Sequence, residues 1–392
     1  MDRRLTFLFA VAAGAAVGNL YWAQPLLDLI AGDFGSSAAG TGWLITSTQV
    51  GYAVGVLLIV PLGDVVDRRR LVAGMLLCSA AALVLCALAP SLGVLLVAVC
   101  LLGLTTVAGQ ILTPLAGDLA DDDRRGRVVG TVASGILTGI LISRTISGLV
   151  AEVAGWRAIY LVAAVLAAAL GALFHRVLPP LPPKTRVRYP ALIASVAVVA
   201  LRERTVRWTL VLGATGFAAF TMFWTSLTFL LSAPPYSYPV SVIGLFGLAG
   251  LAGALAAQRA GRLHDRGWSL PATGAAWLVV LVSFVVAGLA GGSSVAVLLV
   301  AVVGLDAALQ GLAILNQTRV FAVSREARSR INTAFVVCNF AGAALGSAAA
   351  TSLWSAGGWS AVTAAGVVLS CVGLTIWATG RRGALVVATS RP

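Results

Sequence analysis

The sequence predicts an all-α membrane protein with twelve transmembrane helices arranged as two six-helix repeats. Three observations lead to this prediction. The 392 residues are 59% hydrophobic and only 10% charged, with a mean hydropathy of +0.97, a composition that excludes an ordinary soluble globular protein. The apolar residues form long uninterrupted runs, and the basic residues gather between alternate runs.

The apolar runs have the length of membrane-spanning helices. A spanning helix needs about 20 apolar residues, and lipid offers the backbone no hydrogen-bond partners, so a spanning segment must be helical. Uninterrupted runs also lack the alternation that a membrane β-barrel needs. In chain order we predict spanning helices over residues 5–31, 39–62, 71–89, 93–116, 128–151, 157–174, 208–231, 241–258, 270–290, 295–317, 331–353 and 360–380.

The basic residues predict the topology. With the N-terminus in the cytoplasm, 25 of the 27 Lys and Arg residues fall in the termini and in the loops that follow even-numbered helices, as the positive-inside rule expects. The exceptions are Arg157, on the outer side, and Arg144, inside the fifth span. The net charge of +13 is thus explained by topology and anionic headgroups and not by nucleic acid. Both termini are expected in the cytoplasm.

The first run begins like a signal peptide, with charged, then apolar, then small residues. Its apolar character continues from Leu20 to Ile30, so we expect a first spanning helix. The chain has a single lysine, Lys184, and abundant Ala, Gly, Val and Arg, a composition associated with GC-rich bacterial genomes. We therefore expect a multi-pass protein of the bacterial inner membrane.

The residue types that would hold a cofactor or a metal are not clustered. The five cysteines all fall in predicted spans without metal-type spacing, and we expect them to be packing residues without a disulfide. The chain has no Walker loop for ATP phosphates, and no Ser–His pair or metal cluster occurs in the spans. We expect no cofactor, no metal and no enzymatic activity.

The chain repeats itself. Residues 63–68 and 261–266 both read Gly-x-apolar-x-Asp-Arg, 198 residues apart. A shift of about 200 residues also matches Gly103 to Gly304, and a shift of 203 matches Arg127 to Arg330, Gly139 to Gly342, Gly155 to Gly358 and Trp156 to Trp359. Such register indicates an internal duplication. We expect an N-terminal bundle over 1–175, a cytoplasmic linker over 176–207 and a C-terminal bundle over 208–392. Within the linker, Tyr189 to Arg204 has the pattern of an amphipathic helix on the membrane face.

Twelve helices in two parallel repeats, with an Asp-Arg loop in each, resemble the major facilitator superfamily over essentially the whole chain. The resemblance implies that these loops latch the two halves together on the cytoplasmic side. The residues concerned are Gly63, Asp67 and Arg68 in the first loop and Gly261, Asp265 and Arg266 in the second. The first loop departs from the family pattern, because the Gly expected before the later basic residues is missing. The alternative is that these charges only set topology.

The fifth span resembles a motif of the drug–proton antiporters in that superfamily. On the frame Gly139 to Gly148, Ser143, Arg144 and Ser147 stand where the antiporters have Gly, Pro and Gly. The small residues are compatible with close helix packing. In the fourth span Val99 holds the place of an antiporter arginine. We infer that Arg144 supplies the membrane cation that Val99 does not.

A buried arginine needs a partner, and Asp306 is the only acidic residue deep in a predicted span. Each lies 11 residues from the outer end of its helix, at a depth of about 16 Å. Burial favours the protonated carboxylic acid, whereas a nearby arginine favours the carboxylate. We therefore expect Asp306 to carry a coupling proton that Arg144 controls. The alternative is a static ion pair, or an arginine bonded to carbonyls, that fixes helix packing.

The resemblance further implies a central cavity lined by the first, fourth, seventh and tenth helices. Their polar and aromatic residues suit a mostly apolar pocket with a few placed polar groups. The candidate substrate-binding residues are Tyr21, Gln24, Gln110, Trp224, Thr228 and Gln310, with Asn339 from the eleventh helix. Tyr21 could instead belong to an interfacial aromatic belt, as could the neighbouring Trp22, and Asn339 could be a packing residue.

The sequence thus predicts a secondary transporter with alternating access about a central site. The favoured activity is proton-coupled efflux of a small organic compound, such as a drug or a metabolite, by a monomer whose partners are protons and the lipid bilayer. One alternative is uptake or exchange of a small organic acid, amino acid or sugar, with Arg144 binding a carboxylate. An alternative from another class is a non-transporting membrane receptor.

Overall fold

The computed structural model describes residues 2–183, 187–324 and 326–386. Within the helix over Gly250–Asp265, the side chains of residues 252, 254, 255, 257, 258 and 265 lie outside this description. The described residues form helices and connecting turns, with no strand among them. The chain divides into two compact units. The first comprises Met1–Ile193 and Tyr238–Leu248, and the second comprises Ala194–Ser237 and Ala249–Pro392.

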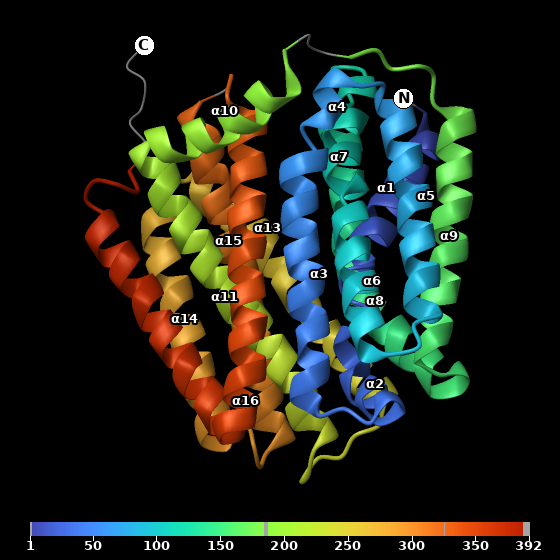
Figure 1. Ribbon diagram of the computed structural model, residues 1–392. Coiled ribbons are helices and arrows are strands. Elements are labelled where there is room, and N and C mark those ends of the chain that lie inside the picture. The colour runs from blue at the N-terminus through green and yellow to red at the C-terminus, as the bar shows by residue number, and fades with distance from the viewer. Residues whose placement is uncertain (1, 184–186, 325, 387–392) are drawn as a thin grey trace. The chain divides into compact units, whose positions relative to one another are not determined.

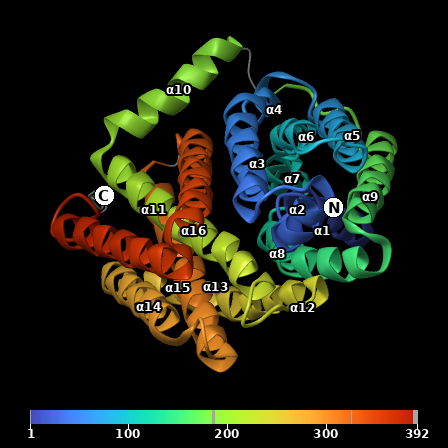
Figure 2. The ribbon, with the colours of Figure 1, turned by 60° about the horizontal axis from the view of Figure 1, so that its bottom comes forward.

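The first unit is a bundle whose long helices run alongside one another (Figure 1) and are seen close to end-on in Figure 2. Its helices follow from the apolar runs of the sequence, with polar residues at their starts. Ser37, Asp67 and Ser91, for example, each accept a hydrogen bond from a backbone N–H of the helix that they precede. The elements are α1 (Arg3–Gly18), η1 (Gln24–Leu26), α2 (Leu27–Phe34), α3 (Ala38–Ile59), α4 (Leu62–Val65), α5 (Arg68–Ala87), α6 (Leu92–Thr105), α7 (Ala108–Leu119), α8 (Arg125–Ala154), α9 (Trp156–Val177) and α12 (Val240–Leu245).

The second unit is likewise helical. Helix α11 contacts α16 over much of its length and also contacts α15, while α14 contacts both α15 and α16. Helix α10 (Tyr189–Arg202) lies in the linker, where the sequence predicts a helix from Tyr189 to Arg204. The elements of the second unit are α11 (Arg204–Ser232), α13 (Gly250–Asp265), α14 (Ser269–Ala290), α15 (Val295–Val323) and α16 (Arg328–Gly380). The short η2 (Phe246–Ala249) follows α12 and ends where the chain passes from the first unit to the second.

Nine helices of the described residues are long and apolar enough to cross a membrane, against twelve predicted spans. The two counts differ at three places. The first predicted span is divided into α1, η1 and α2, and the eighth into α12, η2 and α13. The last two spans form one helix, α16, with non-helical backbone at Gly357 and Gly358. The chain is a multi-pass α-helical protein.

The break in the first span corrects the prediction of one continuous helix over 5–31. Helix α1 ends at Gly18, short turns follow, and the chain becomes helical again at Gln24 and Pro25. Proline has no backbone N–H and disrupts the interior of an α-helix. Irregular backbone at membrane depth is tolerated where protein surrounds it, and residues 18–27 are all buried.

Residues matched by the 203-residue shift have corresponding backbone roles in the two units. Gly155 and Gly358 have positive φ values of 79° and 60°, and each directly precedes a tryptophan at the start of the next span. Gly139 lies against the backbone of Gly14 in α1, and Gly342 lies against the backbone of Ala214 in α11. At both glycines a Cβ atom would come within 2.2 Å of a carbonyl oxygen, so the close approach of the two helices requires glycine there.

Candidate functional site

Arg144 is buried, with 3% of its surface exposed, inside the first unit. Its Nε donates a hydrogen bond of 2.6 Å to Oε1 of Gln24. Its guanidinium lies over the ring of Tyr21, 4.8 Å from the ring centre, in the geometry of a cation–π contact. The break after α1 thus brings two predicted substrate-binding residues, Tyr21 and Gln24, to the buried arginine of α8.

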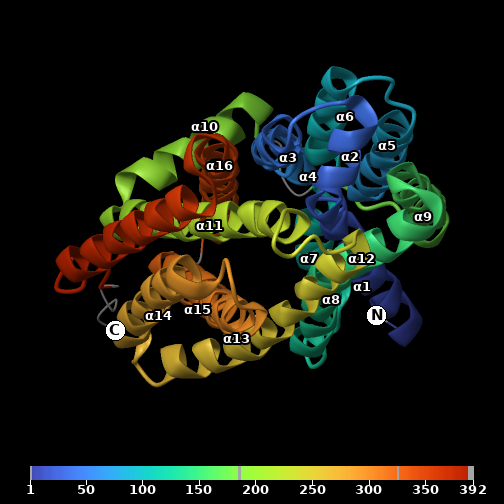
Figure 3. The same cartoon turned by 90° about the horizontal axis from the view of Figure 1, so that it is seen from below.

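Segment α12 lies along the same stretch of α8. Figures 2 and 3 both show α12 beside α8, although about 90 residues separate them in the sequence. Thr145 Oγ1 donates a hydrogen bond of 3.1 Å to the carbonyl oxygen of Gly244. The backbone around Arg144 is therefore held between the broken first span and α12.

A second set of polar side chains lies at the break after α1. None of them was among the predicted substrate-binding residues. Asn19 Nδ2 donates to Thr106 Oγ1 at 3.0 Å, and Asn19 Oδ1 accepts from Trp22 Nε1 at 2.8 Å. Thr106 Oγ1 donates to the carbonyl oxygen of Ala16 at 2.6 Å. These bonds satisfy backbone and side-chain groups that the end of α1 leaves without helical partners. The signal in the sequence is three polar residues, Asn19, Trp22 and Gln24, shortly before Pro25.

Gln110 in α7 is the third predicted substrate-binding residue of the first unit. Its Nε2 donates a 3.0 Å hydrogen bond to the hydroxyl oxygen of Tyr52 in α3. Gln110 is partly exposed, whereas Tyr52 is buried. Tyr52 was not predicted as a site residue, because one tyrosine in an apolar run is typical of a core residue.

Asp306 is buried in the second unit, with 1% of its surface exposed. The Nε1 of Trp224, from α11, donates to its Oδ1 at 3.4 Å. On the other side lies the backbone of α13, where a Cβ atom on Gly253 would come 2.2 Å from Oδ2 and 2.8 Å from Cγ of Gln310. The structure thus brings together three predicted site residues, Asp306, Trp224 and Gln310, and seats the carboxylate against a glycine.

The remaining predicted substrate-binding residues of the second unit lie on α11 and α16. Thr228 is buried and donates to the carbonyl oxygen of Trp224, one turn back. Asn339 is buried against Gly213, and its Oδ1 has no hydrogen-bond partner among the described residues. A buried amide oxygen without a partner is costly, so Asn339 has bonding capacity left for a ligand or water.

Asp67 and Arg68 of the predicted latch have defined partners within the first unit. Asp67 accepts hydrogen bonds from the backbone N–H groups of Arg69, at 2.8 Å, and Leu181, at 3.3 Å. Partial burial alone would raise the pKa of Asp67, but these backbone donors and the nearby Arg70 lower it overall. Arg68 forms a 2.7 Å ion pair with Asp118 at the end of α7. The Asp118 partner was not predicted.

The second latch sequence has a different local setting. Asp265 is the last residue of α13, whereas Asp67 precedes the first turn of α5, so an N-terminal cap is available only to Asp67. The side chain of Asp265 lies outside the described residues. Arg266 is exposed, and its backbone N–H bonds to the last turn of α13. Gly63 and Gly261 have no close neighbours that would demand glycine.

Arg319 is a buried arginine, although the predicted spans place it in a cytoplasmic loop. It lies inside α15 with 2% of its surface exposed. Its guanidinium donates to Asn316 Oδ1 at 2.9 Å, Thr273 Oγ1 at 2.9 Å and Ser269 Oγ at 3.3 Å. The last two partners come from α14. No single-sequence signal identified this site, because α15 continues six residues beyond the predicted end of its span.

The described residues contain no cluster of three His, Cys, Asp or Glu side chains suited to a metal ion. The five cysteines are present as free thiols. Each unit instead contains buried charged and polar side chains, which suit binding and proton transfer.

Comparison with known proteins places this geometry among transporters. The family model for the Major Facilitator Superfamily matches residues 6–335. The "Uncharacterized transporter YgaY" of Escherichia coli O157:H7 is 42% identical over 376 residues, which cover 96% of this chain and 95% of that protein. The "Probable transporter SCO4007" of Streptomyces coelicolor is 37% identical over 91% of this chain and 83% of its own length.

Solved structures share the fold at low sequence identity. A bacterial homologue of the human lysosomal transporter Spinster, in an inward-facing and occupied conformation, superposes with a TM-score of 0.78 at 13% identity, covering 97% of this chain and 96% of the other. A mutant of the peptide transporter POT in complex with alafosfalin has a TM-score of 0.77 at 15% identity, covering 97% and 95%. These similarities concern the fold alone.

Proposed function

Since this chain belongs to the Major Facilitator Superfamily and is a membrane transporter of that type, we propose that it exports small organic compounds in exchange for protons. Transport proceeds by alternating access, with the two six-helix halves of a twelve-span chain rocking about a central site. The protein works as a monomer in the bacterial inner membrane, with both termini in the cytoplasm.

One observation supports proton coupling above all others, namely the buried carboxylate of Asp306. An acidic side chain at membrane depth is costly, and such residues commonly mark ion or proton pathways. The indole N–H of Trp224 and the backbone at Gly253 hold this carboxylate in a defined position. In the proposed cycle Asp306 takes up a proton in one state and releases it in the other.

In this proposal the positive charge of Arg144 controls the proton affinity of Asp306. A cation favours a nearby carboxylate over the carboxylic acid, and its influence falls with distance. Arg144 is anchored by Gln24 and Tyr21 in the first unit, while Asp306 belongs to the second. Rocking of the halves would change the distance between the two groups and hence the proton affinity of Asp306.

The proposed substrate site uses the polar groups around these two residues. Tyr21 and Trp224 offer aromatic faces, and Gln24, Gln110 and Gln310 offer amides. Asn339 and Thr228 add polar groups in the second unit. Such a set suits neutral or cationic aromatic compounds. The Asp-Arg loops, through Asp67 and Arg68 above all, are proposed to stabilise the state that is closed on the cytoplasmic side.

The test is proton movement in everted membrane vesicles that contain the protein. Cationic, neutral and anionic compounds are added in turn, and wild type is compared with Asp306→Asn. Asparagine retains an oxygen for the Trp224 indole but cannot exchange a proton at neutral pH, so we expect compound-induced proton efflux to fall at least tenfold. Asp123→Asn, an exposed carboxylate change, is the matched control and should behave as wild type.

The same measurement separates the alternatives. Full proton-coupled transport by Asp306→Asn would exclude Asp306 as the proton carrier. Transport of anionic compounds alone, lost in Arg144→Gln, would instead support uptake or exchange of a small organic acid, with Arg144 binding the carboxylate. Absence of solute flux in proteoliposomes for every compound tested, with binding retained, would support a receptor.

A further inference from the structure

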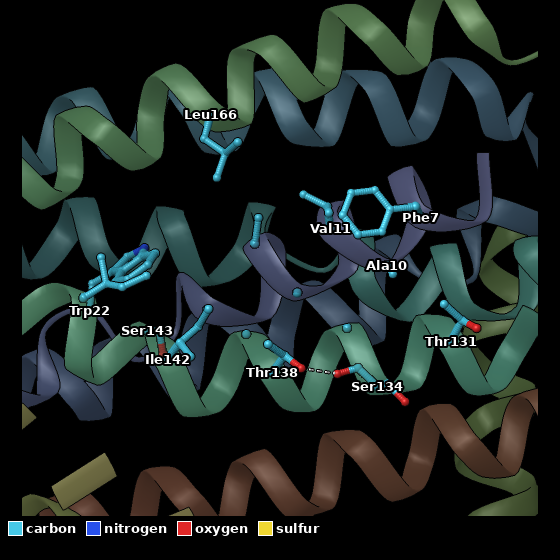
Figure 4. Close-up of a pocket in the computed structure, with 16 residues that line it drawn as sticks. Phe7, Ala10, Val11, Trp22, Thr131, Ser134, Thr138, Ile142, Ser143 and Leu166 are labelled. Atoms are coloured by element: carbon cyan, nitrogen blue, oxygen red, sulfur yellow. Dashed lines mark hydrogen bonds between the residues drawn. The ribbon is translucent and has the colours of Figure 1, made fainter. Parts of the chain in front are cut away.

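A lipid-sized groove runs along the first unit between α1 and α8, with Leu166 of α9 at its side (Figure 4). Its volume is about 470 Å³. On the α1 side Phe7, Val11 and Trp22 contribute apolar surface, and Phe7 is 67% exposed. The groove adjoins the network around Arg144 at Trp22, but the side chains that contact Arg144, Tyr21 and Gln24, do not line it.

The side of the groove formed by α8 presents a mainly apolar surface, although it contains hydroxyl groups. Thr131, Ser134 and Thr138 line the groove, and each hydroxyl donates to the carbonyl oxygen four residues earlier, at 2.8–2.9 Å. A hydroxyl that is bonded within its own helix leaves mainly methyl and methylene groups facing outward. The groove therefore suits a hydrocarbon chain.

A basic pocket of about 560 Å³ adjoins one end of this groove, and both are lined by Phe7 and Thr131. Three arginines line the pocket, namely Arg3, Arg124 and Arg127. Arg124 lies 3.5 Å from Asp123, whereas no ion pair of the described residues involves Arg3 or Arg127. The nearby Asp2 is engaged as the cap of α1, accepting the backbone N–H of Leu5. The basic pocket therefore carries a net positive charge.

The groove is long enough to hold an acyl chain of one membrane leaflet. It follows α8 from Thr131 to Ile146, which is about 22 Å along a helix, whereas one leaflet contributes about 15 Å of hydrocarbon. The arginines lie at the end predicted to face the cytoplasm, where anionic lipids attract basic residues. A headgroup at the arginines and a chain in the groove would follow the orientation of a bilayer lipid.

We propose that this groove and its basic pocket form a binding site for a phospholipid with an anionic headgroup. Arg3 and Arg127 hold the phosphate, and one acyl chain lies in the groove along the crossing of α1 and α8, against Phe7, Val11 and Thr138. The lipid would join the two helices whose crossing carries Arg144, and it is neither the transported compound nor a coupling ion.

The test measures lipid retention and does not depend on transport. Purified protein in detergent is titrated with dioleoyl phosphatidylglycerol or dioleoyl phosphatidylcholine, and bound lipid is counted by native mass spectrometry. The paired variant Arg3→Gln/Arg127→Gln removes the proposed phosphate ligands. Because each basic side chain near an anionic lipid contributes about fivefold, we expect its phosphatidylglycerol affinity to fall roughly 30-fold, to the level of phosphatidylcholine. Arg202→Gln/Arg382→Gln, two exposed arginines outside the pocket, should match wild type.

A second pair of variants tests the chain site. Thr138→Trp fills the groove and should reduce phosphatidylglycerol retention at least fivefold while the arginines remain. Val153→Trp, on the same helix at a position that is 91% exposed, is the control and should retain the lipid. Equal retention of the two lipids by wild type, or unchanged phosphatidylglycerol retention in both Arg3→Gln/Arg127→Gln and Thr138→Trp, would overturn the proposal. Displacement of the lipid by excess glycerol phosphate would show a free phosphate site and would also overturn it.

Discussion

At the scale of single residues, buried charges in this protein are held by neutral side chains from neighbouring segments. Arg319 donates to an asparagine on its own helix and to two hydroxyls of α14, and Arg144 donates to the amide of Gln24. Burying a charge without such partners is costly. Each arginine therefore also positions the helices that supply its partners.

Replacement of Arg319 tests this structural role. In Arg319→Ala, Asn316, Thr273 and Ser269 lose a charged donor and a cavity forms between α14 and α15. We expect the free energy of unfolding to fall by about 2–4 kcal/mol, measured by thermal and denaturant unfolding in detergent. The exposed Arg382→Ala should change stability by less than about 0.5 kcal/mol. Equal stability of the two variants would contradict the assignment of Arg319 as a packing residue.

Asp67 predicts a pH dependence of stability. Its pKa is lowered in the folded state, so the folded protein favours the carboxylate. The resulting stability is fully present above the unfolded pKa of about 3.9 and is lost as the pH falls through the lower folded pKa. We expect Asp67→Asn to lower the melting temperature at pH 7 and to differ less from wild type as the pH approaches 3.5. A gap that widens at low pH would reverse the assigned sign.

At the scale of elements, the crossings of α1 with α8 and of α11 with α16 rest on backbone contact. Gly139 and Gly342 occupy matched positions at these crossings. Lipid tails are as apolar as the helix surfaces, so there is no hydrophobic drive for helices to associate. Association therefore depends on close packing, which small residues allow. The crossing of α1 with α8 also brings Arg144 to the break after α1.

A methyl group at Gly139 should separate α1 from α8. Its Cβ would lie 2.2 Å from a backbone oxygen that cannot move independently, so we expect Gly139→Ala to destabilise by about 1–3 kcal/mol. Gly130→Ala lies on the same helix with nothing within 4 Å, and alanine's helix propensity should leave it neutral or stabilised by up to about 1 kcal/mol. Thermal unfolding of the two variants in one detergent makes the comparison. Identical behaviour would show that α1 and α8 separate without cost.

At the scale of the whole molecule, the charge distribution predicts the side on which the linker lies. Lys184, the only lysine, is expected in the cytoplasm. A membrane-impermeant amine reagent should modify it in everted vesicles and leave it unmodified in intact spheroplasts, as read by peptide mass spectrometry. Lys184→Arg controls for reaction at the N-terminal amine. Modification in intact spheroplasts would reverse the predicted topology.

The sequence accounts for much of the fold because lipid imposes a simple rule. Every long apolar run must satisfy its backbone internally, so the runs predict helices, and the family resemblance of the two Asp-Arg loops agrees with the family match over residues 6–335. Helix interruptions were predicted less well. The break after Gly18 is marked only by a few polar residues and Pro25, which are too few to lower the mean hydropathy of the run. The division of the eighth span lies in a run that stays apolar, so hydropathy has no signal there.

The sequence by itself determined the class of protein, the presence of its helices and two of its buried charges, Arg144 and Asp306, because composition and helix length follow from the bilayer. Only the tertiary structure decided which side chains meet. Arg144 lies against Gln24 and Tyr21 because the chain breaks after α1, and Asp306 lies against Trp224 because α11 and α13 enclose it. Arg319 is buried because α15 extends past its apolar run. These contacts join residues up to 120 positions apart, and periodicity along one chain carries no information about pairs at that separation.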